Sequence, residues 1–221
     1  MRWLSITRVA ALAALTLAVA LPAHSQTKKK PAAGAAPAAV PAVVPVVVDY
    51  AGQFKTVCAA CHGANGRSDM AGVPVIAGNS SLYVITQLFM FREGRRKNEA
   101  MVAMAKPMTD ADLRGFSDYV GTLVAVPAPA PASAPDAARM LKAKVIAEQH
   151  RCTYCHGADL AGGQQVPRIG GQKEDYLRQT LHDFKAGARP GYTRAMTEAL
   201  SQVPVEELDL LAFYAANIGN K

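Results

Sequence analysis

Two copies of one five-residue motif constrain this chain more than any other feature. Cys58-Ala-Ala-Cys61-His62 recurs as Cys152-Thr-Tyr-Cys155-His156, and the two copies use all four cysteines of the 221-residue chain. In a Cys-x-x-Cys-His motif, the two thiols can bind the two vinyl groups of one porphyrin and the histidine can bind its iron. The motifs therefore predict two covalently bound haem c groups, with His62 and His156 as axial ligands.

Paired Cys-x-x-Cys motifs also occur in zinc sites and redox disulfides. A four-cysteine zinc ribbon has its two pairs about 15–20 residues apart, and a thioredoxin-like motif accompanies a strand–helix–strand pattern. Here the motifs are ninety-four residues apart and no such pattern surrounds them. Haem attachment is therefore the preferred interpretation.

Residues 1–25 have the pattern of a secretory signal peptide. Arg2 and Arg8 precede an apolar run from Val9 to Leu21, and small residues stand before a cleavage site at Ser25. We expect removal of this segment and a periplasmic protein, with an uncleaved anchor as the minority alternative. Export agrees with the motifs, because c-type haem is attached outside the bacterial cytoplasmic membrane.

Two proline-rich stretches divide the remaining chain. Residues 26–48 are rich in Lys, Ala and Pro, which indicates an extended tether, and residues 127–135 alternate Pro with Ala or Ser like a linker. Residues 49–126 (domain 1) and 136–221 (domain 2) are then two small domains. Each is near the size at which a cofactor or metal usually completes the core, and a covalent porphyrin provides that apolar mass.

Domain 2 is a second copy of domain 1. Val73-Pro74-Val75-Ile76 matches Val166-Pro167-Arg168-Ile169 at a constant offset. The other matched pairs at this offset are Gly78 and Gly171, Tyr83 and Tyr176, Leu88 and Leu181, Phe91 and Phe184, Gly94 and Gly187, and Arg96 and Arg189. Beyond a two-residue insertion, Met101, Leu113 and Tyr119 match Met196, Leu208 and Tyr214. The chain is therefore predicted to be a tandem duplication.

Each copy is predicted to be mainly helical. Apolar residues have helical spacing over 81–92 and 174–185, and Gly94 and Gly187 stand where left-handed caps would end these helices. No alternating strand pattern competes. The last helix of each copy, called here its closing helix, also has a start signal. In domain 1 it is a capping box at Thr109 and Asp112, and in domain 2 it is Pro204 followed by Glu206 and Glu207 in a first turn.

The second axial ligand of each iron separates electron carriers from enzymes. His150 is tied to the attachment helix, and His182 has Phe89 in its place in domain 1, so neither is expected to bind iron. Beyond its haem motif domain 2 has one methionine, Met196, which aligns with Met101. We therefore expect these two methionines to be the ligands.

Other residues are candidates for binding the iron of domain 1 or for supporting the ligands of both domains. Met104 is the reserve candidate for its iron. A carbonyl usually accepts the second ring N–H of a metal-bound histidine, and we expect the carbonyls of Pro74 and Pro167 to do so. Arg96 and Arg189 either pair with haem propionates or are solvated surface charges. A thioether ligand raises the reduction potential and fills the iron, which favours electron transfer over catalysis.

The chain resembles the di-haem cytochrome c4 family of class I cytochromes c. The shared motifs are Cys-x-x-Cys-His-Gly-Ala, Val-Pro-x-Ile-x-Gly, Tyr-x4-Leu-x2-Phe-x2-Gly-x-Arg and the late Met101 and Met196. The resemblance implies an all-α fold of two tandem cytochrome c domains related by approximate twofold symmetry, each around one covalent haem. It also implies that Pro74 and Pro167 are the prolines that orient the axial histidines.

The resemblance further implies a periplasmic carrier of single electrons, often from a quinol-oxidising cytochrome bc complex to a terminal oxidase. The alternative is the di-haem subunit of a periplasmic dehydrogenase, as in flavocytochrome c sulfide dehydrogenases. A di-haem enzyme such as a peroxidase or thiosulfate dehydrogenase needs an open or unusual axial site, so we expect no enzyme activity. The formal charge of +7 comes without a basic stripe interleaved with aromatics, so nucleic acid is not an expected partner. Peripheral association with a membrane is left open.

Overall fold

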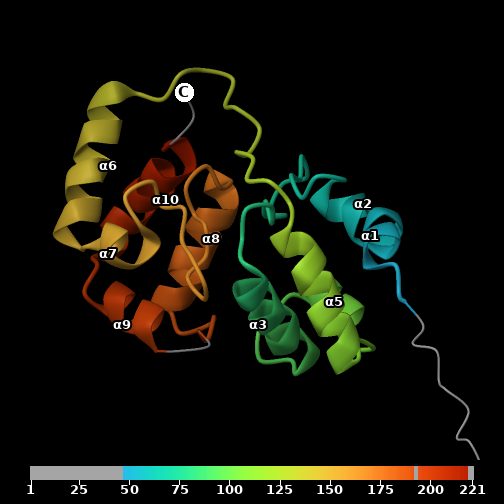
Figure 1. Cartoon of the computed structure of the whole chain (residues 1–221). Coiled ribbons are helices and arrows are strands. Elements are labelled where there is room, and N and C mark those ends of the chain that lie inside the picture. Colours follow the sequence, from blue (N-terminus) through green and yellow to red (C-terminus); the bar gives the residue numbers. More distant parts are fainter. Residues whose placement is uncertain (1–46, 192–193, 219–221) are drawn as a thin grey trace, which may run out of the picture. The chain divides into compact units, whose positions relative to one another are not determined.

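The computed structural model describes residues 47–191 and 194–218, and within these ranges the chain is helical (Figure 1). Extended pairing in this part is limited to one isolated bridge between Gly163 and Val166. The predicted signal peptide and the predicted tether up to residue 46 lie outside the described residues. The all-α prediction is confirmed. In chain order, the elements are α1 (Tyr50–Gln53), the π-helical turn η1 (Phe54–Cys58), α2 (Ala59–His62), α3 (Ser81–Arg92), α4 (Glu99–Ala105), α5 (Asp110–Gly121), α6 (Ala137–Gln149), α7 (Cys152–His156), α8 (Glu174–Lys185), α9 (Ala195–Ser201), the 3-10 turn η2 (Val205–Glu207) and α10 (Leu208–Asn217).

The middle helices, α3 and α8, have the bounds that their apolar spacing predicts. The hydroxyl of Ser80 caps the start of α3 by accepting the N–H of Tyr83. Beyond the helix ends, Gly94 and Gly187 have positive φ angles of 64° and 72°, the left-handed conformation expected of these caps. None of the helices in the described ranges is long and apolar enough to cross a membrane.

The closing helices start as predicted in domain 1 and differently in domain 2. Thr109 and Asp112 form a full capping box at the start of α5. Pro204 instead precedes the short 3-10 turn η2, and α10 begins after it at Leu208. A 3-10 turn is a common way to enter a helix, because its tighter bonds satisfy some of the first backbone groups.

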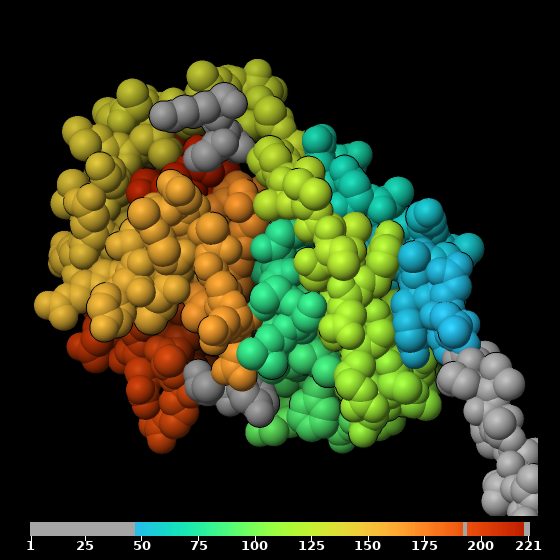
Figure 2. Space-filling view, viewed as in Figure 1, coloured from blue at the N-terminus to red at the C-terminus, as the bar shows by residue number. Residues whose placement is uncertain are grey.

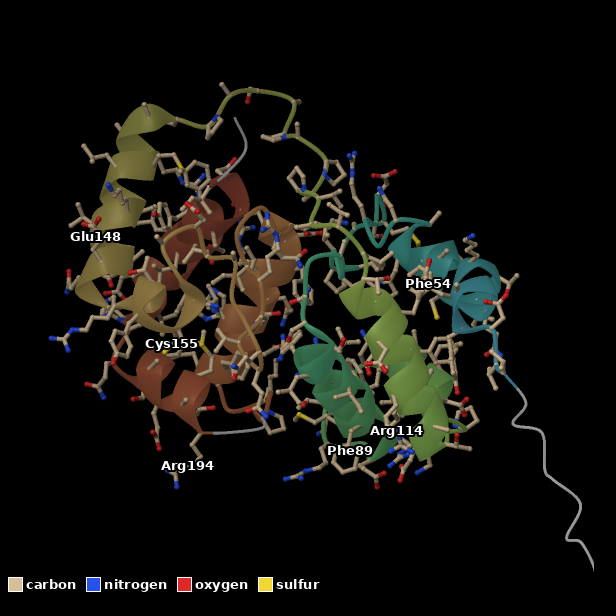
Figure 3. All side chains as sticks on the ribbon, viewed as in Figure 1. Phe54, Phe89, Arg114, Glu148, Cys155 and Arg194 are labelled. Atoms are coloured by element: carbon tan, nitrogen blue, oxygen red, sulfur yellow. The ribbon has the colours of Figure 1, made fainter. Side chains whose placement is uncertain are left out.

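Each domain has its own apolar core. In domain 2, buried side chains of α6, α8 and α10 form one contiguous cluster around Leu208 and Ala212, both 0% exposed. In domain 1, the amino-terminal turns pack on α5 through two aromatic contacts. The ring centroids of Phe54 and Tyr119 are 5.0 Å apart, and those of Tyr50 and Phe116 are 5.1 Å apart (Figure 3 labels Phe54).

Matching residues of the two copies build the contact between the domains. The N–H of Val75 donates to Oε1 of Gln172 at 2.8 Å, and Nε2 of Gln172 donates to the carbonyl of Val75 at 2.7 Å. The reciprocal contact joins the N–H of Arg168 to Oδ1 of Asn79 at 3.1 Å. Asn79 is the equivalent of Gln172, and Val75 is the equivalent of Arg168. Reciprocal contacts of this kind define a twofold interface, so the domains are related by pseudo-twofold symmetry.

The linker predicted at 127–135 is anchored at its start. Ala128 is 9% exposed, and its N–H donates to the carbonyl of Gly171 at 2.7 Å. Since the prolines on either side have no N–H, this alanine supplies the donor that a Pro-Ala repeat can offer there. The linker therefore begins packed against domain 2, and does not behave as a free spacer at this point.

Gly78 is predicted to be required where the two domains meet. Its φ is +76°, and an added Cβ would lie 2.8 Å from Cα of Ala125 and 3.0 Å from Cδ of Arg168. Gly94 is the matched control, because its φ is +64° and a Cβ there meets nothing within 4 Å. We expect Gly94→Ala to lower the free energy of unfolding by about 1 kcal/mol from backbone strain alone. We expect Gly78→Ala to cost a further ~1–3 kcal/mol from the clash.

Guanidinium denaturation of the haem-loaded protein measures the free energy of unfolding of the Gly78→Ala and Gly94→Ala variants. Equal losses would mean that the segment at Ala125 in domain 1 and the side chain of Arg168 in domain 2 both move aside to accept the added methyl group.

Candidate haem-binding sites

The four cysteines lie on short helical turns in equivalent places. Cys58 ends η1 and Cys61 lies on α2, while Cys152 and Cys155 share α7 (Figure 3 labels Cys155). No disulfide joins any two of them, and Cys61 and Cys155 are exposed. Burial raises the pKa of the Cys58 and Cys152 thiols.

The histidine that ends each motif is buried, and a backbone carbonyl holds its ring. Nδ1 of His62 lies 3.2 Å from the carbonyl oxygen of Pro74, and Nδ1 of His156 lies 3.0 Å from that of Pro167. A carbonyl can only accept, so Nδ1 carries the proton and Nε2 keeps a lone pair. Both rings therefore present the nitrogen that an iron ion would need, and the two prolines occupy the places expected of them.

Burial also controls the charge of these two rings. Burial lowers the pKa of His62 and of His156, and the hydrogen bond to the proline carbonyl offsets this only in part. Both imidazoles are therefore neutral near pH 7, which is the form that binds a metal. This donor set, two thiols and one oriented neutral imidazole per domain, fits covalent haem c.

In each domain, hydrogen bonds hold the loop that connects the motif histidine to the proline whose carbonyl it contacts. In domain 1 the N–H of Ile76 donates to the carbonyl of Gly66 at 2.8 Å, and the hydroxyl of Ser68, 1% exposed, donates to the carbonyl of Cys61 at 2.6 Å. In domain 2 the N–H of Ile169 donates to the carbonyl of Leu160 at 2.9 Å. These bonds fix the loop, and hence the ring plane of the histidine.

The candidate methionines occupy two seven-residue helices that match in the repeat. Met101 lies in α4 and is half-buried, and its N–H is capped by Oδ1 of Asn98 at 3.0 Å. Met196 lies in α9, where it packs against the core of domain 2. Met104 is more exposed, at 41%. The assignment of the two aligned methionines as iron ligands stays a prediction.

The two arginines matched across the repeat meet at one tyrosine. Nη2 of Arg96 donates to the hydroxyl oxygen of Tyr176 at 2.9 Å, and Nη1 of Arg189 lies 3.3 Å from the same atom. Arg96 also donates to Gln87, and Arg189 donates to Thr180. The solvated-surface interpretation of these arginines is therefore wrong. Their paired guanidinium groups suit the carboxylates of haem propionates.

The arginines also set the charge of the tyrosines between them. Burial raises the pKa of Tyr176, but the charges of Arg96 and Arg189 outweigh it and lower that pKa to about 7. Tyr83, its equivalent in domain 1, has a raised pKa because of burial and of its neighbour Tyr176. The two guanidinium groups therefore concentrate positive charge at the junction of the two haem domains, and ionisation of Tyr176 around neutral pH offsets part of it.

The histidines outside the motifs are bound to carboxylates. Nε2 of His150 lies 2.8 Å from Oε2 of Glu207, and Nε2 of His182 lies 2.9 Å from Oδ1 of Asp209. These contacts agree with the expectation that neither histidine binds iron. Within the described ranges, no three His, Cys, Asp or Glu side chains gather as ligands of a metal ion.

Sequence patterns missed one pair of residues that positions these sites. Asn79 and Gln172 join the domains directly beyond the loops that hold the haem histidines. The available signal was an amide side chain at the same place in both copies of the repeat.

Known proteins resemble this chain over most of its length. The family model described as Cytochrome c matches residues 51–123. Cytochrome c4 of Thiocapsa roseopersicina is 32% identical over 164 residues, covering 72% of this chain and 85% of that protein. The thiosulfate dehydrogenase electron acceptor of Thiomonas intermedia (strain K12) is 32% identical over 166 residues, covering 66% of this chain and 76% of that protein.

A solved structure shares the fold. Reduced recombinant cytochrome c4 from Pseudomonas stutzeri superposes with a TM-score of 0.67 at 25% identity, covering 76% of this chain and 96% of that chain. A match of this length is longer than one domain of the repeat. The similarity therefore includes both haem motifs together with the segments that hold them.

Proposed function

Because the chain belongs to the cytochrome c4 family of di-haem electron-transfer proteins, we propose that it accepts single electrons from a periplasmic oxidoreductase and passes them to the respiratory chain. The chain binds two covalent haem c groups and is an electron carrier, not an enzyme. We also propose that the protein acts in the periplasm after removal of residues 1–25, and that its partners there are redox proteins. The iron ligands that we propose are His62 with Met101 and His156 with Met196.

One observation supports the histidine ligands: each motif histidine is buried and held by a carbonyl in the tautomer that leaves Nε2 for iron. The methionine ligands are proposed from their matching places in the repeat. When bound, each haem supplies a one-electron Fe(III)/Fe(II) couple. The chain's own part is to orient the two imidazoles and to keep them neutral. It also holds positive charge at Arg96 and Arg189, where carboxylates of the haems would bind. Met101 and Met196 would each hold an iron through a thioether, a ligand that raises the potential and leaves no position for exogenous ligands.

The partner classes are a quinol-oxidising cytochrome bc complex, a terminal oxidase and a periplasmic dehydrogenase. Similarity to an electron acceptor of thiosulfate dehydrogenase supports a dehydrogenase as the donor. We therefore favour a donor of the thiosulfate dehydrogenase class, with the bc complex as the second candidate. For the final acceptor we propose an oxidase, the partner that the family resemblance implies.

A potentiometric titration with spectra at each step tests the ligand sets. We expect two low-spin haems, each with a near-infrared thioether-to-iron band and without carbon monoxide binding in the reduced state. A high-spin haem that binds carbon monoxide readily would favour a di-haem enzyme. Anaerobic stopped-flow reduction tests the donor, by comparing thiosulfate dehydrogenase with its substrate against a bc complex with quinol.

A further inference from the structure

An apolar groove lies between α3 and α5 in domain 1, apart from the haem motifs. It has a volume of about 400 Å³, and its apolar residues are Leu82, Ile85 and Phe89 of α3 with Leu113 of α5. Leu82 is 45% exposed, and the side chains of Ile85 and Phe89 are half-buried. Figure 2 shows α3 and α5 packed side by side, and Figure 3 places Phe89 near Arg114 of the neighbouring helix.

The equivalent face of domain 2 is polar and carries ion pairs. Asp175, Arg178 and His182 stand where domain 1 has the three apolar side chains of α3. Asp209, which replaces Arg114, lies 2.9 Å from Nε2 of His182 and 3.5 Å from Nε of Arg178. The face in domain 2 is therefore suited to contact with water, whereas the equivalent face in domain 1 leaves apolar surface exposed. Since the fold itself tolerates the polar version, the fold alone does not require the apolar one.

The rim of the groove is basic. Arg92 pairs with both nearby carboxylates, with Nε 2.9 Å from Glu93 and Nη1 2.7 Å from Asp110. Arg114, exposed on α5, also lines the groove, so the lining contains two arginines and one carboxylate, that of Asp110. Positive charge therefore remains around an apolar floor. A second copy of the chain would bring the same charges against it, whereas a partner with carboxylates would be attracted.

We propose that the α3–α5 groove of domain 1 is the docking surface for a partner protein that presents an apolar helix face edged with carboxylates. The groove reaches domain 2 at Gln165, so this partner would lie over the junction of the two haem domains. The inference rests on the proposed function in one respect, because it takes the partner to be a redox protein. It assigns docking to domain 1 alone.

Calorimetric titration of the haem-loaded chain with synthetic helical peptides tests the groove directly. The probe is about five turns long, with leucines on one face and glutamates along both edges, and its control has lysines in place of the glutamates. Leu82→Asp and Phe89→His introduce the residues that domain 2 already has, so the scaffold is expected to tolerate them. His182→Phe is the matched change in domain 2.

We expect the glutamate peptide to bind, and the lysine peptide to bind at least about tenfold more weakly. Leu82→Asp and Phe89→His should each weaken binding about tenfold, as loss of a central contact does, while His182→Phe leaves it unchanged. Absence of binding, or equal binding by all variants, would overturn the proposal. So would a dimer in sedimentation experiments that Phe89→His dissociates, because the occupant would then be a second copy. Circular dichroism confirms that each variant is folded.

Reduction kinetics separate this inference from the proposed donor. If thiosulfate dehydrogenase does not reduce the wild-type chain while the peptide still binds in the groove, the donor is wrong and the groove stands. If the enzyme reduces wild type and Leu82→Asp at equal rates at limiting concentration, the donor stands and docking at the groove is overturned.

Discussion

Replacing Met101 by alanine is expected to open the haem of domain 1, and replacing Met196 is expected to open the haem of domain 2. Each variant should lose one near-infrared thioether-to-iron band, show one haem that binds carbon monoxide, and keep the other haem unchanged. A thioether favours ferrous iron, so its replacement by water should lower one potential by roughly 0.1–0.3 V. Optical potentiometry and the spectrum of the reduced carbon monoxide complex measure both effects.

Met104→Ala is the matched control for the first of these variants. Its side chain is 41% exposed on the same short helix, so its removal should leave both potentials unchanged. If Met104→Ala opens a haem and Met101→Ala does not, the ligand assignment in domain 1 is wrong. In domain 2 Met196 is the single methionine beyond the haem motif, so an unchanged Met196→Ala spectrum would require a ligand of another type.

The elements that local chemistry determines could be predicted from the sequence. The bounds of α3 and α8 follow from apolar spacing and from the glycines beyond their ends. The capping box at Thr109 involves residues three apart, so it too depends on local sequence alone. The haem motifs have the same property, because five consecutive residues contain both attachment thiols and one ligand.

Contacts that depend on how the two copies pack could not be predicted. Arg96 and Arg189 looked equally suited to solvent, because nothing nearby in the sequence shows that both reach Tyr176. The repeat does show which positions are equivalent. It does not show that Asn79 bonds to Arg168 of the other copy, since that requires the axis of symmetry to be known.

The difference between Phe89 and His182 illustrates the same limit. In the sequence this mismatch bears on iron ligation, because a shared ligand would be present in both copies. Its other meaning requires the facing residues of α5 and α10. Asp209 is placed to bond His182, and Arg114 stands in the equivalent place beside Phe89.

The two domains are expected to depend unequally on their haems. Domain 2 has a contiguous buried cluster built on the thirteen-residue helix α6 together with α8 and α10. In domain 1 the corresponding helical run consists of α1, η1 and α2, continuous from Tyr50 to His62 within the described residues. Domain 1 also buries apolar side chains of η1, α3 and α5, but its contiguous cluster of buried residues is the smaller one of Val75, Ala77 and the linker residue Ala128. A porphyrin is therefore a larger share of the apolar core in domain 1.

Removing one pair of attachment thiols at a time tests this asymmetry. With both Cys58 and Cys61 replaced by serine, domain 1 should lose its helices and become sensitive to protease, a loss on the order of 5 kcal/mol, comparable to the whole stability of a small domain. With Cys152 and Cys155 replaced, domain 2 should keep most of its helical circular dichroism, because its protein core persists. Equal loss of helix in the two double variants would contradict the expectation. It would mean that each haem, and not the size of the contiguous buried cluster, determines whether its domain folds.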